Sequence, residues 1–216
     1  MGQHMSNKAP LATVEIHGPA YTIGDRRVTK LVVLPLSFRQ FVDAIEAANA
    51  ARAAMRVPPK SNRKFVLREK RAMQVRAVLD GGGEPVAIAL EDMSRMPRAY
   101  AMQIDAVLEA SVEPDGKVIG KGDGAITPVL YAFGTPIKVG DVECPELEFM
   151  ARTLGDIEDV LAESSRVAMT LALIRNCSKP IMTEKSLLVL PEWAIDQITL
   201  IDGLAIMEHV LPSFLG

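Results

Sequence analysis

Hydrophobic and polar positions follow the same order in two stretches of the chain, residues 23–46 and 139–162. Each stretch has a Gly-Asp pair, a short apolar-rich run, a hydroxyl residue and then an amphipathic segment. The pairs begin at Gly24 and Gly140, and the two stretches align without a gap. Glycine tolerates a positive φ and aspartate bonds back to its own backbone, so each pair predicts a tight turn. The shared order predicts an internal repeat.

Strands are predicted on both sides of each turn. Residues 14–16 and 129–131 are expected as the first strands. Residues 28–33 and 144–150 follow the turns, and their alternating or β-branched residues are typical of second strands. Each half therefore begins with a β-hairpin.

A helix is predicted after each hairpin. Ser37 and Thr153 can each cap a helix, because a hydroxyl oxygen accepts a hydrogen bond from a free backbone N–H of the first turn. Apolar residues then recur at helical spacing, which provides a stripe wide enough to cover a small sheet. These residues are Phe38, Phe41, Val42 and Ile45 in the first half and Leu154, Ile157, Val160 and Leu161 in the second.

The remainder of each half matches less closely. Helices are predicted around residues 73–79 and 167–174, each followed by a polar break. Pro97 and Pro191 then open further helices, since the first helical position does not need the N–H that proline lacks. The terminal helices align only with a gap.

These elements predict an α+β fold, mainly helical, with two similar subdomains, each a short β-hairpin followed by about three helices. A repeat of about 100 residues indicates duplication of a whole domain rather than a solenoid. The predicted boundaries are a disordered tag remnant at 1–9, a first repeat at 10–111 with a basic insertion near 49–70, a linker at 112–124 and a second repeat at 125–216.

Composition narrows the class of protein. The chain has 216 residues, of which 49% are hydrophobic and 24% charged, as in globular domains. A net charge of −3 disfavours a general nucleic-acid or membrane binder. No apolar run approaches the roughly 20 residues that a membrane span needs. The eleven methionines are expected mainly as core filler, with an adaptable binding surface as the alternative.

Candidate chemistry is sparse. His17 and His209 have no partner at catalytic spacing, and Cys144 and Cys177 have none at metal-ligand spacing, so we expect inert thiols. The glycine-rich run at 120–124 lacks the Lys-Ser/Thr ending and the helix of a phosphate loop. The sequence therefore predicts no enzyme, no cofactor and no metal.

One segment, residues 52–76, is strongly basic in an otherwise acidic chain. A solvated loop, an arm for an acidic protein partner and a nucleic-acid contact all remain open, with nucleic acid disfavoured because only Phe65 could stack on a base. The basic residues are Arg52, Arg56, Lys60, Arg63, Lys64, Arg68, Lys70, Arg71 and Arg76.

Two stretches resemble a known family. Residues 138–161, KVGDVECPELEFMARTLGDIEDVL, resemble the hairpin-to-helix opening of phage tail assembly chaperones of the Mu- and P2-like type. Residues 189–215, VLPEWAIDQITLIDGLAIMEHVLPSFL, resemble the closing helices of that family. The resemblance covers about residues 125–216 and reaches the first half only through the repeat. The family usually has one such domain, so two tandem copies and a basic insertion depart from it.

The resemblance implies a non-enzymatic protein of the bacterial host cytoplasm that binds the tape measure protein, the tail tube protein or both during tail assembly. A homo-oligomer also remains open, and no membrane partner is expected. Apolar helix faces would supply the binding surface, with core burial as the alternative. The candidate residues are Met96, Tyr100, Trp193, Leu204, Met207, Val210, Leu211 and Phe214. The rival interpretation is a virion or host-directed adaptor that binds protein or nucleic acid through residues 52–76.

Overall fold

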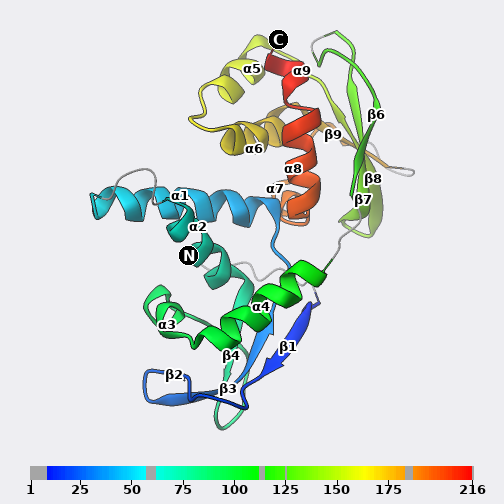
Figure 1. The fold of residues 1–216 in the computed structure, drawn as a ribbon. Helices are drawn as coiled ribbons and strands as arrows, with labels where there is room; N and C mark the ends of the chain where they lie inside the picture. Colours follow the sequence, from blue (N-terminus) through cyan, green and yellow to red (C-terminus); the bar gives the residue numbers. More distant parts are fainter. Residues whose placement is uncertain (1–8, 57–61, 112–114, 125, 183–186, 216) are drawn as a thin grey trace. The chain divides into compact units, whose positions relative to one another are not determined.

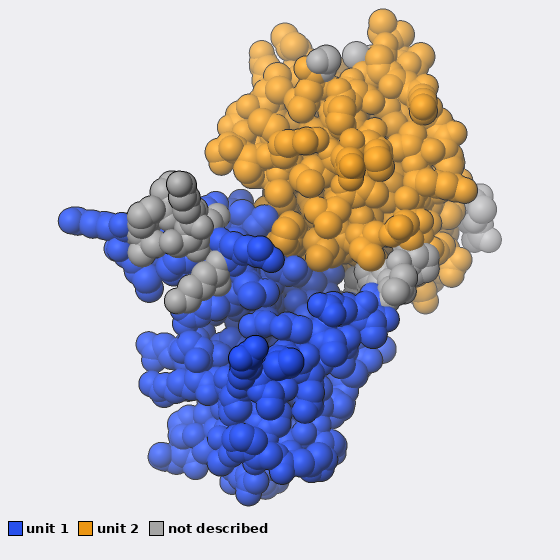
Figure 2. Space-filling model, viewed as in Figure 1, with its two compact units in different colours: residues 1–36, 43–112 blue, residues 37–42, 113–216 orange. Residues whose placement is uncertain are grey.

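The computed structural model describes residues 9–56, 62–111, 115–124, 126–182 and 187–215 (Figure 1). Their contacts form two compact units (Figure 2). Unit 1 comprises residues 1–36 and 43–112, and unit 2 comprises residues 37–42 and 113–216. The tag remnant expected at 1–9 lies, except for its last residue, outside the described residues.

Unit 1 is built on an antiparallel sheet with the strand order β1-β3-β4-β5, in which β2 pairs with the start of β3. Gly24, at φ +57°, makes the β2–β3 turn. The strand bounds are β1 (Ala12–Glu15), β2 (Thr22–Ile23), β3 (Arg26–Val33), β4 (Val75–Leu79) and β5 (Val86–Ala87).

The helices of this region are α1 (Phe38–Ala54), α2 (Asn62–Gln74), α3 (Leu90–Arg95) and α4 (Arg98–Ala110). The start of α1 belongs to unit 2 and its remainder to unit 1. α4 packs on β1 and β3 (Figure 1). Tyr100 and Ile104 of α4 meet Leu31 and Val75 of the sheet in the core of unit 1.

Unit 2 has a four-stranded antiparallel sheet in the order β6-β7-β8-β9. Gly140, at φ +67°, lies in the tight β7–β8 turn. The strand bounds are β6 (Lys117–Gly120), β7 (Val129–Val139), β8 (Val142–Phe149) and β9 (Ser178–Ile181).

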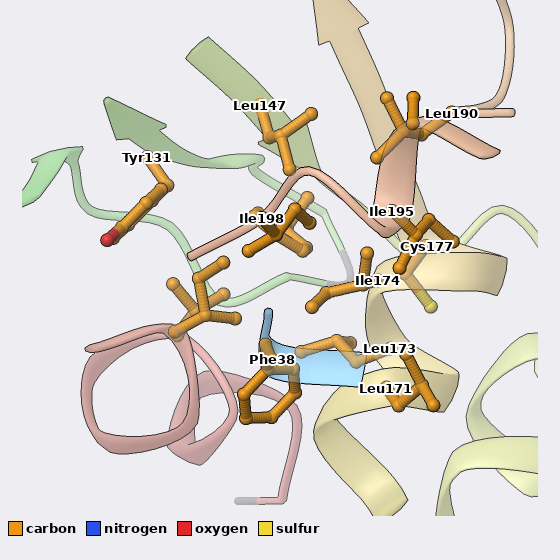
Figure 3. Packing of buried hydrophobic residues seen from close by; sticks show 14 of the residues in the cluster. Phe38, Tyr131, Leu147, Leu171, Leu173, Ile174, Cys177, Leu190, Ile195 and Ile198 are labelled. Carbon is orange, nitrogen blue, oxygen red and sulfur yellow. The ribbon is translucent and has the colours of Figure 1, made fainter. Parts of the chain in front are cut away.

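Helices α6 and α8 contact this sheet (Figure 1). The helices are α5 (Leu154–Leu161), α6 (Arg166–Cys177), α7 (Glu192–Ile195), α8 (Leu200–His209) and α9 (Pro212–Leu215). Figure 3 shows Phe38, from the start of α1, in the same apolar cluster as Leu173 of α6 and Ile198. The Phe38 ring fills the space beside Gly203, where any side chain would collide with it.

Several predicted elements are confirmed. Hairpins form around both Gly-Asp turns. Ser37 accepts from Gln40 N at 3.2 Å as the cap of α1, and Thr153 accepts from Asp156 N at 3.2 Å in a capping box at α5. The α+β class is therefore correct, and the caps explain why helices begin at these two hydroxyl residues.

The expectation of a mainly helical fold is wrong, because 44% helix is accompanied by 26% strand. Residues 75–79, expected in a helix, form β4, where Val75 and Ala77 face the core and Arg76 lies between them. In a run of only five residues, alternating burial and β-branched side chains favour a strand rather than a helix, even directly after a helix. Each unit therefore has a sheet of four or more strands rather than a lone hairpin.

Two further predicted segments contain regular structure. The stretch predicted as a linker, 112–124, contains β6. The described parts of the basic insertion predicted near 49–70 belong to α1 and α2. Both units have a hairpin, two helices and a strand in that order, but unit 1 has β5 and α3 before its proline-capped helix α4, whereas in unit 2 the proline-capped helix α7 follows β9 directly. Common ancestry of the two halves remains a prediction.

Candidate protein-interaction site

The most exposed aromatic position of the described chain lies in unit 2, on the short helix α7. Trp193 is 52% exposed, and Leu188 and Val189, just before it, are 72% and 46% exposed. The intervening Leu190 is buried, and so is Ala194 after it. The buried residues hold this segment on the core of unit 2, so its exposed side chains are presented on a fixed backbone.

Pro191 directly precedes α7. It is the N-cap residue rather than the first helical residue that was predicted, as is Pro97 at α4, and Ala194 N donates to the Pro191 carbonyl at 2.9 Å. α7 is only one turn long, so packing rather than helix propensity must stabilise it. Ala194 and Ile195 provide that packing, which leaves the Trp193 side chain on the solvent side.

Ion pairs join α7 to the start of α1 and the end of α6 within unit 2. Arg39 Nη1 lies 2.7 Å from Glu192 Oε2 and 3.4 Å from Asp196 Oδ1. Arg175 Nε lies 2.8 Å from Glu192 Oε1, although its N–H is not aligned for a hydrogen bond. Exposed ion pairs each contribute at most about 1 kcal/mol. A network of them is still suited to fix the orientation of α7.

Exposed large apolar side chains are more numerous in unit 2 than in unit 1. In the described part of unit 1 they are Met55, Leu67, Val86 and Met102. In unit 2 they are Ile119, Ile126, Leu154, Leu161, Leu188, Val189, Trp193 and Leu215. Single exposed apolar residues are ordinary on a protein surface, so the grouping of three within residues 188–193 is what marks this segment.

The predicted partner-binding residues separate by burial. Tyr100, Val210 and Leu211 are buried, so their assignment to a surface is wrong. The Tyr100 hydroxyl donates to the Pro19 carbonyl at 2.9 Å, which is a structural role within unit 1. Four more are half-buried: Met96, Leu204, Met207 and Phe214. Of the predicted set, Trp193 alone is exposed.

The basic residues of 52–76 are largely engaged within unit 1. Arg71 Nη2 donates to both Asp105 oxygens, at 2.7 and 2.5 Å. Arg68 Nη2 donates to the Leu90 carbonyl at 3.3 Å, and Arg76 Nη1 contacts three backbone carbonyls at 3.0 Å. Arg52 and Lys70 also have partners. Arg56 and Arg63 are exposed, whereas Lys60 and the side chain of Lys64 lie outside the described residues.

A buried carboxylate lies at the start of α8. Asp202 Oδ1 accepts from Tyr131 Oη at 2.8 Å and Gly134 N at 3.1 Å, and Oδ2 accepts from Thr199 Oγ1 at 2.9 Å. Burial, the Asp202 charge and this hydrogen bond raise the pKa of Tyr131, so the phenol remains a donor. A side chain at Gly116 would collide with Tyr131 and Asp202, so the cluster leaves no space there for a substrate. Its role is structural.

The described residues contain no group of histidine, cysteine and acidic side chains suited to a metal ion. Within the same residues, no helix is long and apolar enough to cross a membrane. Cys144 and Cys177 are buried, and burial raises the pKa of both thiols, that of Cys177 to about 12. Such thiols are poor nucleophiles at neutral pH.

Sequence reasoning identified Trp193 but missed Leu188 and Val189. No local signal distinguished them, because Leu188 and Val189 lie in a bend and the next residue of the same apolar run, Leu190, is buried. Comparison with protein families, curated proteins and solved structures finds no match for this chain. The assignment of function therefore depends on the geometry of the surface and on the resemblance noted in the sequence.

Proposed function

We propose that the protein is a non-enzymatic phage tail assembly chaperone that binds the tape measure protein and assists assembly of the tail tube. The observation that carries the proposal is the exposed set of Leu188, Val189 and Trp193 on a segment whose Leu190 and Ala194 are buried in the core of unit 2. The resemblance of residues 138–161 and 189–215 to this family supplies the identity of the partner.

The chemistry of this segment suits protein recognition. Tryptophan is the side chain most enriched at energetic hot spots, and neighbouring polar residues that exclude water increase its contribution. Glu192 of α7 forms such a polar group with Arg39 of α1 and Arg175 of α6. A rigid surface also lowers the entropy lost on binding, because the side chains are already positioned.

The partner class is taken from the resemblance, and the exposed apolar side chains of this segment suit it. A tape measure protein of the resembled family is long, apolar and rich in helix, so it requires cover until tube subunits surround it. Exposed leucine, valine and tryptophan side chains can bury its apolar stripes, which is the usual mode of helix recognition. A chaperone of this kind needs no catalytic group.

The rival adaptor function through residues 52–76 has less support. Arg68, Arg71 and Arg76 make hydrogen bonds within unit 1, so these guanidinium groups already have acceptors. A phosphate-binding arm would instead present several uncommitted cations along one groove. We therefore do not favour nucleic acid as the partner.

Co-expression with the tape measure protein of the same phage tests the proposal. The wild-type chain should keep that protein in the soluble fraction and co-purify with it. The Trp193→Ala variant should reduce recovery about tenfold or more, as expected for loss of a hot-spot side chain. Met102→Ala, which also removes an exposed apolar side chain but in unit 1, is the matched control and should behave as wild type.

An insoluble tape measure protein in the presence of the wild-type chain would overturn the proposed function. Equal recovery with wild type and Trp193→Ala would overturn the assignment of the surface. Circular dichroism of each purified variant establishes that the loss does not arise from unfolding.

A further inference from the structure

Helix α5 carries an apolar stripe that the core of unit 2 does not use. Leu154 and Leu161, two turns apart on one face, are 73% and 51% exposed, and Ile157 between them is half-buried. Spacing of three, four and seven residues places side chains on the same face of a helix. The adjacent face, next to Ile157, is anchored, because Val160 is buried and α5 packs on α6. The stripe therefore faces solvent on an ordered helix.

The charges along this helix have one sign. From Thr153 to Ser165 the sequence contains Asp156, Glu158, Asp159 and Glu163 but neither lysine nor arginine. Asp156 is used in the capping box, and Asp159 accepts from Asn176 Nδ2 at 3.4 Å. Glu158 and Glu163 are exposed and form no ion pair with any part of the chain that the structure describes.

The nearest cations along the chain are directed elsewhere. Arg152, before α5, donates through Nη2 to the Leu188 carbonyl. Arg166, after α5, donates through Nη2 to the Met207 carbonyl at 3.1 Å. Neither guanidinium therefore pairs with Glu158. Glu158 is four residues after Leu154 and so lies on the same face of α5. The stripe thus combines leucines with an unpaired carboxylate.

We propose that the α5 face, defined as Leu154, Ile157, Glu158 and Leu161, docks a basic amphipathic helix of a partner protein. Apolar contacts along the stripe would supply affinity, and lysine or arginine beside the partner's apolar residues would meet Glu158 and Glu163. The same carboxylates repel phosphate, so they argue against nucleic acid or an anionic membrane. A helix is favoured as occupant because its ridges match the spacing of another helix.

This inference deepens the proposed function and rests on it only for the identity of the partner. The Arg152–Leu188 hydrogen bond ties the residue before α5 to the exposed segment 188–193. A partner that covers Trp193 could therefore continue along α5. The chemistry of the α5 face can still be tested without the tape measure protein.

The test uses a labelled synthetic peptide of about 18 residues, five helical turns, with leucines on one face and lysines beside them. A second peptide carries glutamate in place of every lysine. Fluorescence anisotropy with the full-length protein should give at least about tenfold tighter binding of the lysine peptide. The Leu154→Ser/Leu161→Ser double variant should weaken that binding about tenfold, because two exposed apolar anchors are lost.

Two variants complete the design. Glu158→Lys/Glu163→Lys should reverse the preference between the two peptides. Ile126→Ser, which removes an exposed apolar side chain of unit 2 outside α5, should bind as wild type. All substituted positions are exposed, so folding is expected to persist, and circular dichroism checks it.

Equal affinity for the two peptides would overturn the inference, as would unchanged binding by the leucine double variant, which would indicate non-specific adsorption. Self-association of the wild type that the double variant abolishes would also overturn it, by assigning the face to a second copy. If the wild type did not bind the lysine peptide but still kept the tape measure protein in solution, the docking role of the α5 face would be refuted and the proposed function would stand. Peptide binding without any effect on the tape measure protein would refute the proposed function instead.

Discussion

The side-chain amide of Gln197 pairs with the backbone of Lys138 as a neighbouring strand would. Gln197 Oε1 accepts from Lys138 N at 2.9 Å, and Gln197 Nε2 donates to the Lys138 carbonyl at 2.8 Å. Strand β6 pairs only with residues 130–132 of β7, so β7 continues beyond its neighbour. Open strand edges invite pairing with other chains, and Gln197 closes this one near the β7–β8 turn.

Two other residues protect the same stretch of β7. Gly134 N donates to the buried Asp202, and Pro136 has no N–H to offer. These features leave few free backbone N–H groups on this part of β7, so the sheet edge is protected from pairing with another chain.

Gln197→Ala should lower the free energy of unfolding by about 1 kcal/mol, because Lys138 loses both partners on a partly solvated edge. It should also increase self-association at high protein concentration. Urea denaturation and light scattering measure the two effects. Gln103→Ala, at an exposed glutamine of α4, is the control and should change stability by less than about 0.5 kcal/mol. If self-association did not increase, the Gln197 side chain would not be needed to protect the edge of β7.

Asp202→Ala should strongly destabilise unit 2. It removes the carboxylate acceptor of the Tyr131 hydroxyl, the Gly134 N–H and the Thr199 hydroxyl in a buried site, which costs about 3–5 kcal/mol. Asp202→Asn keeps one acceptor oxygen and should lose less. Thermal or urea unfolding measures whether the alanine variant is less stable than the asparagine variant. A loss no greater than that of Asp196→Ala, at a partly exposed aspartate, would contradict the structural role given to this cluster.

The burial of Asp202 illustrates how far the sequence could predict this site. Thr199 three residues before an aspartate is a readable helix start, and a hydroxyl residue before an apolar stripe correctly placed the start of α5 at Thr153. Whether such an aspartate is exposed or buried depends on which other elements of the fold pack against the start of the helix. Here Tyr131 and Gly134 come from a strand about 70 residues earlier in the chain, and local pattern carries no such information.

The same limit explains the error at β4. Residues 75–79 follow α2 without a break, so local spacing fitted a longer helix. Pairing with β3 decides the matter, since Val33 faces Val75 and Leu31 faces Ala77 in the ladder. The hairpin turns were predictable because Gly24 and Gly140 act locally. Burial of Val210 and Leu211 was not, because it depends on long-range contacts.

Alanine at Gly24 or Gly140 should destabilise the protein by about 1 kcal/mol in each case. Both glycines have positive φ, and no atom lies within 4 Å of the position that an added Cβ would take, so the cost comes from the backbone alone. Gly155→Ala, inside α5 with ordinary φ, should instead stabilise by up to about 1 kcal/mol. Chemical denaturation compares all three. Opposite effects of alanine at Gly24 and Gly140 would count against equivalent turns.

Stability should fall between about pH 9 and pH 12. Burial raises the pKa of Cys177 from 9.0 and that of Tyr21 from 10.0, each to about 12, so the folded state retains protons that the unfolded state releases. The stabilisation is complete below the unfolded values and is lost as pH approaches 12. Unfolding measured across this range should be less steeply pH-dependent in Tyr21→Phe and Cys177→Ala. An unchanged pH profile in both variants would contradict the assignment.

Arg71→Ala should destabilise unit 1 by about 1–2 kcal/mol, because the guanidinium donates to both oxygens of Asp105 and links α2 to α4. Arg71→Lys should recover only part of the loss, since an ammonium cannot make the same planar pair. Arg63→Ala, an exposed residue of the same helix, is the control and should leave stability within about 0.5 kcal/mol. If Arg71→Ala were as stable as Arg63→Ala, the basic segment would have to be regarded as uncommitted charge, and the adaptor function through residues 52–76 would regain support.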